Sequence, residues 1–187
     1  MQDEIFKALA ILKRGGIILY PTDTVWGIGC DATNVDAVKK TYQLKQREET
    51  KSMLVLVEHA DRIGRYVRDV PEMAWQLIEV NDEPMTIIYP GAINLAPNLI
   101  GQDNTIGIRI VQDEFCQKLI ARLNRPLVST SANISGQPSP AIFSEVSDEI
   151  KNGVDYIVNW RQDDSVISSS SSIIKIGLGG EIEIIRK

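Results

Sequence analysis

The chain has 187 residues, of which 43% are hydrophobic and 24% are charged, and its formal net charge is −5. This composition is typical of a globular protein with a sizeable core, and it excludes a disordered or fibrous chain. The negative charge argues against a broadly basic surface for nucleic acid, so a polyanion would need a local basic cluster.

Residues that could carry metal or thiol chemistry are scarce. The sequence has one histidine, His59, and two cysteines, Cys30 and Cys116, that lie far apart. This inventory excludes a Cys/His zinc cage and disfavours a disulfide framework. A Cys–His nucleophile pair stays open in principle, but buried structural thiols are the commoner outcome.

No targeting or membrane signal stands out in the sequence. No stretch approaches the roughly 18 uninterrupted apolar residues that a membrane helix requires. The N-terminal segment is acidic before it becomes basic, which is the reverse of a secretory signal. We therefore expect a cytoplasmic protein.

Apolar periodicity predicts helices and strands that alternate early, with short strands clustered late. The predicted helices lie at residues 2–14, 34–43, 60–68, 71–80, 113–123 and 141–150. The predicted strands lie at residues 17–20, 53–57, 85–89, 106–110, 127–130, 156–158, 171–176 and 181–185. Gly177 to Gly180 form a hairpin signal between the last two strands. This order predicts a single α/β domain over residues 1–187, with a mixed, twisted sheet and flanking helices.

Two polar segments in the first third lie next to predicted strands, where α/β folds gather ligand sites. In PTDTVWGIGCDA, Thr22 and Thr24 bracket Asp23, and the same pattern also suits a tight turn stabilised by hydroxyls. In LKQREETKSM, the cations Lys45, Arg47 and Lys51 form a candidate anion site. The alternative is a solvated helix end, which the neighbouring acids Glu48 and Glu49 favour.

A third polar segment, LVSTSANISGQPSP at residues 127–140, continues a predicted strand with hydroxyl and amide side chains. Such groups bind phosphate, ribose or a small polar substrate, although a plain polar loop has the same composition. It is neither a Walker loop nor a GxSxG elbow, and a single histidine disfavours a Ser-His-Asp triad. Arg109 interrupts the apolar strand IGIRI, so it should face a polar cavity or a carboxylate. Arg186, taken alone, suits a surface charge.

Several of these pieces occur in one order along nearly the whole chain: PTDTVWGIGCDA, LKQR with Lys51, MLVLV, PG, TIGIRI, LVSTSANISGQPSP, SSIIKI and IIRK. Together they resemble the YrdC-like family, also called TsaC, of L-threonylcarbamoyladenylate synthases. The family's K-x-R…S-x-N signature is matched by residues 45–47 and 131–133. The resemblance implies a twisted α/β sheet around a large, positively charged, concave cavity.

The resemblance also implies an activity. The family uses ATP, L-threonine and bicarbonate or CO₂ to make threonylcarbamoyl-AMP and pyrophosphate. Other proteins then transfer the threonylcarbamoyl group to an adenosine of certain tRNAs, and a direct tRNA contact is left open. Mg²⁺ is expected to bridge the phosphates, held largely by ATP and water, so no metal-ligating residue is assigned.

The resemblance carries site residues over to this sequence. It implies catalytic roles for Lys45, Arg47, Ser131 and Asn133. It implies that ATP is bound by Arg47, Lys51, Thr105, Ser131, Ser139 and Arg186. It implies that threonine is bound by Thr24, Arg109, Ser129 and Ser172, with the arginine pairing with the amino-acid carboxylate.

The sequence departs from the family pattern at four positions. Glu48 replaces a usual proline, Ala92 the second proline of a PGP, Leu56 a common histidine and Lys175 a common acid. These changes concern the amino-acid pocket, and they leave a carbamoyl-adenylate enzyme with another substrate as an alternative. A rival of a different class is an RNA-binding module with a basic concave surface. A net-acidic chain with few aromatic residues favours cations that converge on one pocket.

Overall fold

The computed structural model describes residues 1–165 and 170–187. Its α-helices are α1 (Gln2–Lys13), α2 (Val35–Leu44), α3 (Glu72–Val80), α4 (Glu114–Leu123) and α5 (Asp148–Gly153). Short 3₁₀ helices are η1 (Ala60–Arg65), η2 (Pro97–Leu99) and η3 (Phe143–Glu145). The strands are β1 (Ile18–Tyr20), β2 (Gly27–Gly29), β3 (Leu54–Val57), β4 (Met85–Pro90), β5 (Thr105–Ile110), β6 (Leu127–Ser131), β7 (Tyr156–Ile157), β8 (Ser172–Ile176) and β9 (Ile182–Arg186).

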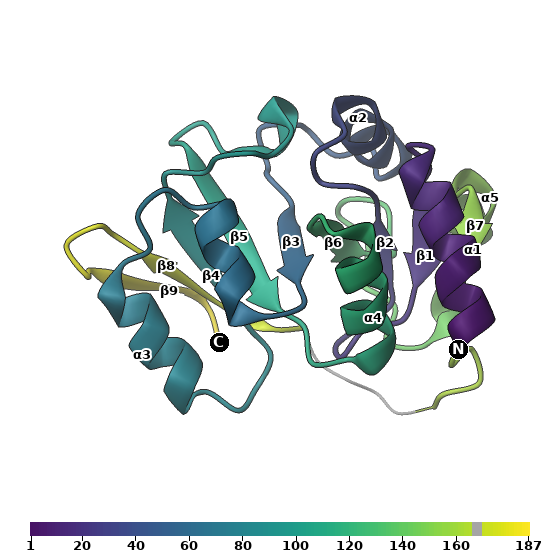
Figure 1. Cartoon of the computed structure of the whole chain (residues 1–187). Helices are drawn as coiled ribbons and strands as arrows, with labels where there is room; N and C mark the ends of the chain where they lie inside the picture. Colours follow the sequence, from purple (N-terminus) through teal and green to yellow (C-terminus); the bar gives the residue numbers. More distant parts are fainter. Residues whose placement is uncertain (166–169) are drawn as a thin grey trace.

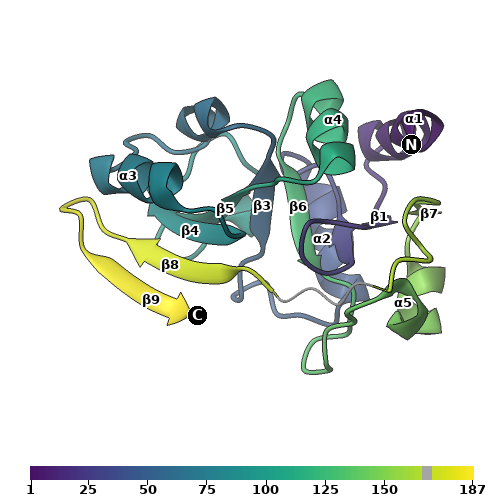
Figure 2. The ribbon, with the colours of Figure 1, turned by 90° about the horizontal axis from the view of Figure 1, so that it is seen from below.

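The strands form one mixed sheet in the order β7-β1-β2-β6-β3-β5-β4-β8-β9. The pairs β1–β7, β3–β5 and β4–β8 are parallel, and the other neighbours are antiparallel. Figure 1 shows this sheet behind α1, α3 and α4, with the β8–β9 hairpin at one end. Seen from below in Figure 2, the sheet curves, and β8 and β9 project away from the side on which α1, α3 and α4 lie. The expected α/β fold with a mixed, twisted sheet is confirmed.

Side chains alternate across the central strands, and this alternation separates core from polar residues. Ile87 and Tyr89 of β4 and Ile106 and Ile108 of β5 belong to the largest buried apolar cluster. Their neighbours along the same strands point to the opposite face of the sheet. A second cluster buries apolar faces of α1 and α4, which lie side by side in Figures 1 and 2. The core therefore fixes the central strands and leaves their other face available for a site.

The structure corrects three details of the predicted elements. Residues 27–29, for which no strand was predicted, form strand β2 between β1 and β6. A Cβ on Gly29 would lie 2.6 Å from a Tyr20 ring carbon and 2.7 Å from the Val128 carbonyl oxygen, so this strand requires glycine there. The predicted helix at 60–68 is only the 3₁₀ helix η1, and the segment 141–150 divides into η3 and the start of α5.

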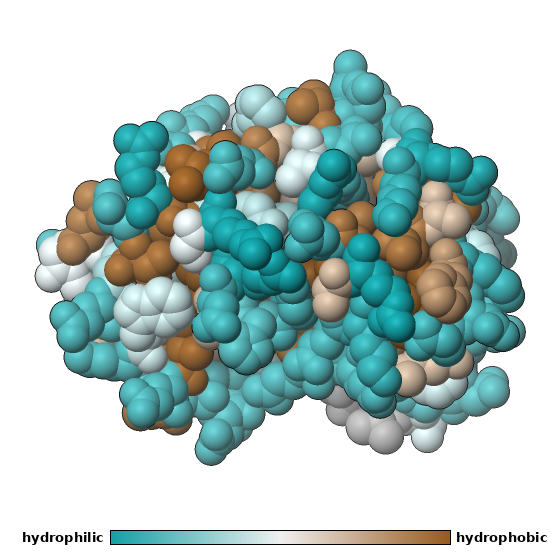
Figure 3. Space-filling model, in the orientation of Figure 1, coloured by the Kyte–Doolittle hydropathy of each residue, from teal (hydrophilic) through white to brown (hydrophobic). Residues whose placement is uncertain are grey.

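The molecular surface is largely hydrophilic on the face that Figure 1 presents. Figure 3 shows the hydrophobic residues of this face in separate groups among hydrophilic ones. In the part of the chain that the structure describes, no helix is both long and apolar enough to cross a membrane.

Candidate active site

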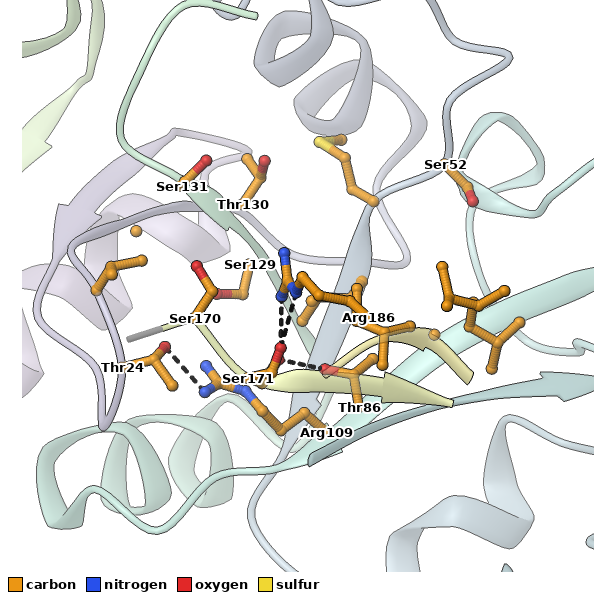
Figure 4. Close-up of a pocket in the computed structure, with 18 of the residues that line it drawn as sticks. Thr24, Ser52, Thr86, Arg109, Ser129, Thr130, Ser131, Ser170, Ser171 and Arg186 are labelled. Atoms are coloured by element: carbon orange, nitrogen blue, oxygen red, sulfur yellow. Dashed lines mark hydrogen bonds between the residues drawn. The ribbon is translucent and has the colours of Figure 1, made fainter. Parts of the chain in front are cut away.

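A cavity of about 410 Å³ lies against the polar face of the central strands. Its volume falls within the range of about 300–1,000 Å³ that is usual for small-molecule sites. Its lining comes from the loop after β1, the loop after α2, strands β2 to β6, the loop after β6, and β8 and β9. Segments that are distant in sequence therefore meet in one site, as the close-up in Figure 4 shows.

Strands β4 and β5 form the floor of the cavity. Thr86 and Ile88 of β4 face it, as do Thr105, Gly107 and Arg109 of β5. Thr86 pairs with Arg109 and Ile88 with Gly107 in the antiparallel register. A Cβ at Gly107 would lie 3.3 Å from the Thr86 methyl carbon, so a larger residue would crowd this part of the floor. A planar group could lie on Ile88 and Gly107, beside the polar side chains of the floor.

Arg109 is the central cation of the floor. Its side chain is 3% exposed, and Nη1 donates to Thr24 Oγ1 at 2.9 Å. The same nitrogen lies 2.9 Å from Asp23 Oδ1, an ion-pair contact rather than a well-aligned hydrogen bond. The Arg109 Nε has no hydrogen-bond partner among the described residues. The arginine thus meets both a carboxylate and a polar cavity.

Arg186 reaches the same cavity from β9. Its Nε and Nη2 donate to the Ser171 carbonyl oxygen at 3.0 and 2.6 Å, as Figure 4 shows. Burial, together with the nearby Arg109 charge, lowers the pKa of Arg186. The Ser171 hydroxyl lies 2.9 Å from the Thr86 hydroxyl, which ties β8 to the floor. Arg186 is therefore part of the site, although its place at the end of the sequence suggested a surface charge.

Arg47 supplies a cation from the loop after α2. Its Nε donates to the Lys51 carbonyl oxygen at 2.7 Å, and Nη2 donates to the Ser52 carbonyl oxygen at 3.1 Å. Among the described residues, neither Arg47 nor Arg186 has a carboxylate within ion-pair distance. Their positive charges are therefore oriented by carbonyl dipoles without being neutralised.

Lys175 of β8 is a further cation of the lining, and its charge is paired. Its Nζ lies 2.7 Å from Asp103 Oδ2, and Thr105 donates to the other carboxylate oxygen at 2.6 Å. The hydrogen bond from Lys175 lowers the pKa of the Asp103 carboxyl and raises that of the Lys175 ammonium. The described lining residues include Arg47, Arg109, Lys175 and Arg186 but no carboxylate. In a chain of net charge −5, this concentration of cations marks an anion-binding cavity.

The segment after β6 forms a hydroxyl-rich wall. Ser129 and Ser131 have the same strand parity and both line the cavity, as does Ser139 beyond the turn. The Asn133 side chain is used within the turn, where Nδ2 donates to the carbonyl oxygens of Ile134 and Gln137 at 3.0 and 2.7 Å.

Lys45 lies behind this wall and is 1% exposed. Its Nζ donates to the carbonyl oxygens of Ser131 and Asn133 at 2.5 and 2.6 Å. Burial, with a smaller contribution from the nearby Arg47, lowers the pKa of Lys45 to about 8.

Most of the residues assigned by resemblance come together in the cavity. The assigned residues that belong to the lining are Thr24, Arg47, Thr105, Arg109, Ser129, Ser131, Ser139 and Arg186. Four assigned residues are not part of the lining: Lys45, Lys51, Asn133 and Ser172. Lys51 is exposed, and its Nζ lies 3.6 Å from Glu48. Ser172 alternates with the lining residue Ser171, so its side chain points to the other face of β8.

Sequence reasoning did not single out several residues of the site. These are Ser52, Thr86, Ser170 and Ser171. Thr86 carries a signal that could have found it, because it is the only small polar residue in the otherwise apolar and aromatic run MTIIY. The two serines before β8 belong to a serine run whose register cannot be read from composition. Of the departures from the family pattern, Leu56 is fully buried in the core.

Comparisons with known proteins agree with this architecture. A family model for Sua5, YciO and YrdC proteins, described as "Telomere recombination", matches residues 10–187. A threonylcarbamoyl-AMP synthase of Pseudoalteromonas translucida (strain TAC 125) is 32% identical over 161 residues, covering 84% of this chain and 86% of that protein. P. abyssi Sua5 complexed with L-threonine matches with a TM-score of 0.81 at 25% identity, over 92% of this chain and 50% of that one. This chain thus spans about half the length of that Sua5. E. coli YciO matches with a TM-score of 0.86 at 22% identity, over 100% of this chain and 90% of that one, which supports the fold alone.

Proposed function

Because the chain belongs to the Sua5/YciO/YrdC family, we propose that it makes L-threonylcarbamoyl-AMP and pyrophosphate from ATP, L-threonine and bicarbonate or CO₂. The observation that carries this proposal is that Arg47, Arg109 and Arg186 converge on one cavity whose described lining has no carboxylate. The curated relatives named threonylcarbamoyl-AMP synthase support the reaction, and the Sua5 complex supports threonine as the amino acid.

The proposed chemistry needs positioning and charge neutralisation more than a protein nucleophile. The threonine amine adds to CO₂ to give a carbamate, and a carbamate oxygen then attacks the α-phosphorus of ATP. The bond from the α-phosphorus to its bridging oxygen breaks, and pyrophosphate leaves with the electron pair. Arg47 and Arg186, whose charges are not neutralised by a carboxylate of the described residues, would stabilise the triphosphate and the leaving pyrophosphate.

The cysteines do not suit a covalent alternative. Burial raises the pKa of the Cys30 thiol to about 12 and raises that of the Cys116 thiol as well. Both thiols are buried, so neither is a reactive thiolate at neutral pH. His59 is largely exposed and contacts Asp61 instead. Direct transfer between bound substrates therefore fits the chain better than a Cys–His pair.

The floor of the cavity suits an amino acid. The threonine carboxylate would meet Arg109, and the Thr24 and Ser129 hydroxyls line the same space. Ser171, which lines the cavity, would take the role near threonine that the resemblance implied for Ser172. The nucleotide would then lie toward Arg47, Ser131, Ser139 and Arg186.

Magnesium would have to be carried by the nucleotide. No group of His, Cys, Asp and Glu among the described residues is suited to a metal, and the described lining has no carboxylate. The residues present therefore provide no ligand set of their own for Mg²⁺. Phosphate and water oxygens would supply the ligands, so the protein's share is to orient the phosphates.

A second candidate within the same chemistry is an enzyme that adenylates the carbamate of another amine. The pair of Lys175 and Asp103 favours it, because it places a lysine at a position where the family often has an acid. An RNA-binding module is less well supported, because the cations converge on one cavity. The proposed product would go to tRNA threonylcarbamoyl-transfer proteins, and the cytoplasm is the location that this role requires.

Product analysis with each substrate omitted in turn tests the proposed function. With ATP, L-threonine and bicarbonate, we expect equal amounts of pyrophosphate and threonylcarbamoyl-AMP, measured by a coupled assay and by mass spectrometry. Leaving out threonine should abolish both products. Pyrophosphate release that is independent of threonine would contradict the amino-acid assignment, and restoration by another amine would favour the second candidate.

A further inference from the structure

We propose that Lys45 is a positioning residue that holds the turn after β6 from behind, without contacting the substrates. The turn, defined here as residues 131–137, presents Ser131 to the cavity and leads to Ser139. This role differs from the direct catalytic contact that the resemblance implied for Lys45. Its consequence for ATP binding rests on the proposed function, whereas the contacts of Lys45 with the turn do not.

Three hydrogen bonds join Lys45 to this turn. The ammonium donates to the carbonyl oxygens of Ser131 and Asn133, and the Lys45 carbonyl oxygen accepts from the Ser135 amide at 2.8 Å. The side chain is 1% exposed and is not part of the cavity lining. One residue therefore joins the end of α2 to both ends of the S-x-N segment.

The energetic reason is the cost of burying unpaired polar groups. A buried ammonium is tolerated only when it is well hydrogen-bonded, and a buried carbonyl without a donor costs about 1–3 kcal/mol. Lys45 caps the C-terminus of α2, where the helix dipole favours a cation. Replacing the lysine with an apolar side chain would remove this donor from the Asn133 carbonyl oxygen and would leave the Ser131 carbonyl oxygen with the Asn133 amide at 2.9 Å.

The backbone between Lys45 and Arg47 explains why the two cations act in different places. Gln46 has a φ of 49°, in the left-handed region, so the chain turns sharply between them. Arg47 faces the cavity, while Lys45 points behind the wall. The S-x-N half divides in the same way, because Ser131 lines the cavity and Asn133 bonds within the turn. Each half of the signature thus supplies one cavity residue and one residue that builds the turn.

The test compares Lys45→Met with the matched variant Arg47→Met. Hydrogen exchange of amides 131–137 is measured in the ligand-free proteins, and calorimetry gives the affinities for AMP and ATP. We expect Lys45→Met to accelerate exchange in the turn and to weaken AMP and ATP by the same factor, about tenfold. Arg47→Met should leave exchange in the turn unchanged and weaken ATP more than AMP.

A milder variant, Lys45→Gln, keeps an N–H donor but removes the charge. It should retain more of the nucleotide affinity than Lys45→Met, and it decides the question if Lys45→Met does not fold. The proposal is overturned if Lys45→Gln and Lys45→Met leave exchange in the turn unchanged while their loss of affinity grows from AMP to ATP. Because the exchange measurement uses no ligand, it remains decisive even if the wild-type protein proves not to bind ATP.

Discussion

Arginine side chains are held differently in two regions of the cavity. One region is the floor at β5, and the other consists of the outer segments that carry Arg47 and Arg186. Arg109 is buried and lies against the Asp23 carboxylate, so its charge is largely compensated and its orientation is fixed. Arg47 and Arg186 are held only by backbone carbonyl oxygens among the described residues. A compensated, oriented guanidinium suits one carboxylate, whereas uncompensated charges suit a polyphosphate. The difference predicts which end of the cavity receives which substrate.

The largest expected effect comes from replacing Arg109, the inner arginine, which lies on the floor of the cavity. Arg109→Met should lower the free energy of unfolding by about 3–5 kcal/mol, because it leaves Asp23 as an uncompensated carboxylate that is mostly buried. It should also abolish threonine binding. Urea denaturation and calorimetry with threonine measure the two effects.

A double variant separates stability from binding at this position. Asp23→Asn combined with Arg109→Met removes both charges, so it should recover part of the lost stability without recovering threonine binding. Wild-type threonine affinity in the double variant would show that the inner arginine does not receive the amino acid.

Removing an outer arginine should affect binding much more than stability. Arg186→Ala is expected to weaken ATP binding about 10- to 100-fold, because it removes charged hydrogen-bond donors from the phosphate side. The unfolding free energy should change little, because Arg186 lies on the exposed terminal strand β9. Lys187→Ala is the matched control, since it removes the adjacent charge outside the cavity lining. Equal losses in the two variants would mean that Arg186 acts only through net charge.

The smallest expected effect concerns the ion pair between Lys175 and Asp103. Lys175→Ala should change ATP affinity less than about threefold, because Asp103 already compensates the lysine. Asp103→Asn should raise ATP affinity by a similar factor, since it frees the lysine while an amide oxygen can still accept from Thr105. Calorimetry at two salt concentrations measures both, and the gain should disappear at high salt. A large loss in Lys175→Ala would place this lysine among the uncompensated outer cations.

The sequence predicted the fold class because that depends on local patterns, whereas the residues expected at the site came mostly from the family resemblance. Arg109 interrupts the apolar run IGIRI and was therefore expected to face a polar cavity or a carboxylate, and the structure shows it beside Asp23 and in the cavity lining. The predicted strands and most helices also agree with the structure. Strand β2 was missed because Gly27 and Gly29 read as breakers, whereas contacts with Tyr20 and Val128 from neighbouring strands require glycine at position 29.

What the sequence by itself determined is the order of strands and polar segments, and therefore which segments could form an anion site. Tertiary structure decided which side chains face the cavity. Ser171 rather than Ser172 lines it because the register of β8 against β4 sets the parity, and that register depends on pairing between distant strands. Lys45 and Arg47, two residues apart, diverge because Gln46 turns the chain and the segment after β6 covers Lys45. Charge pattern identified the cations, but only packing separated those that face the cavity from the one that supports its wall.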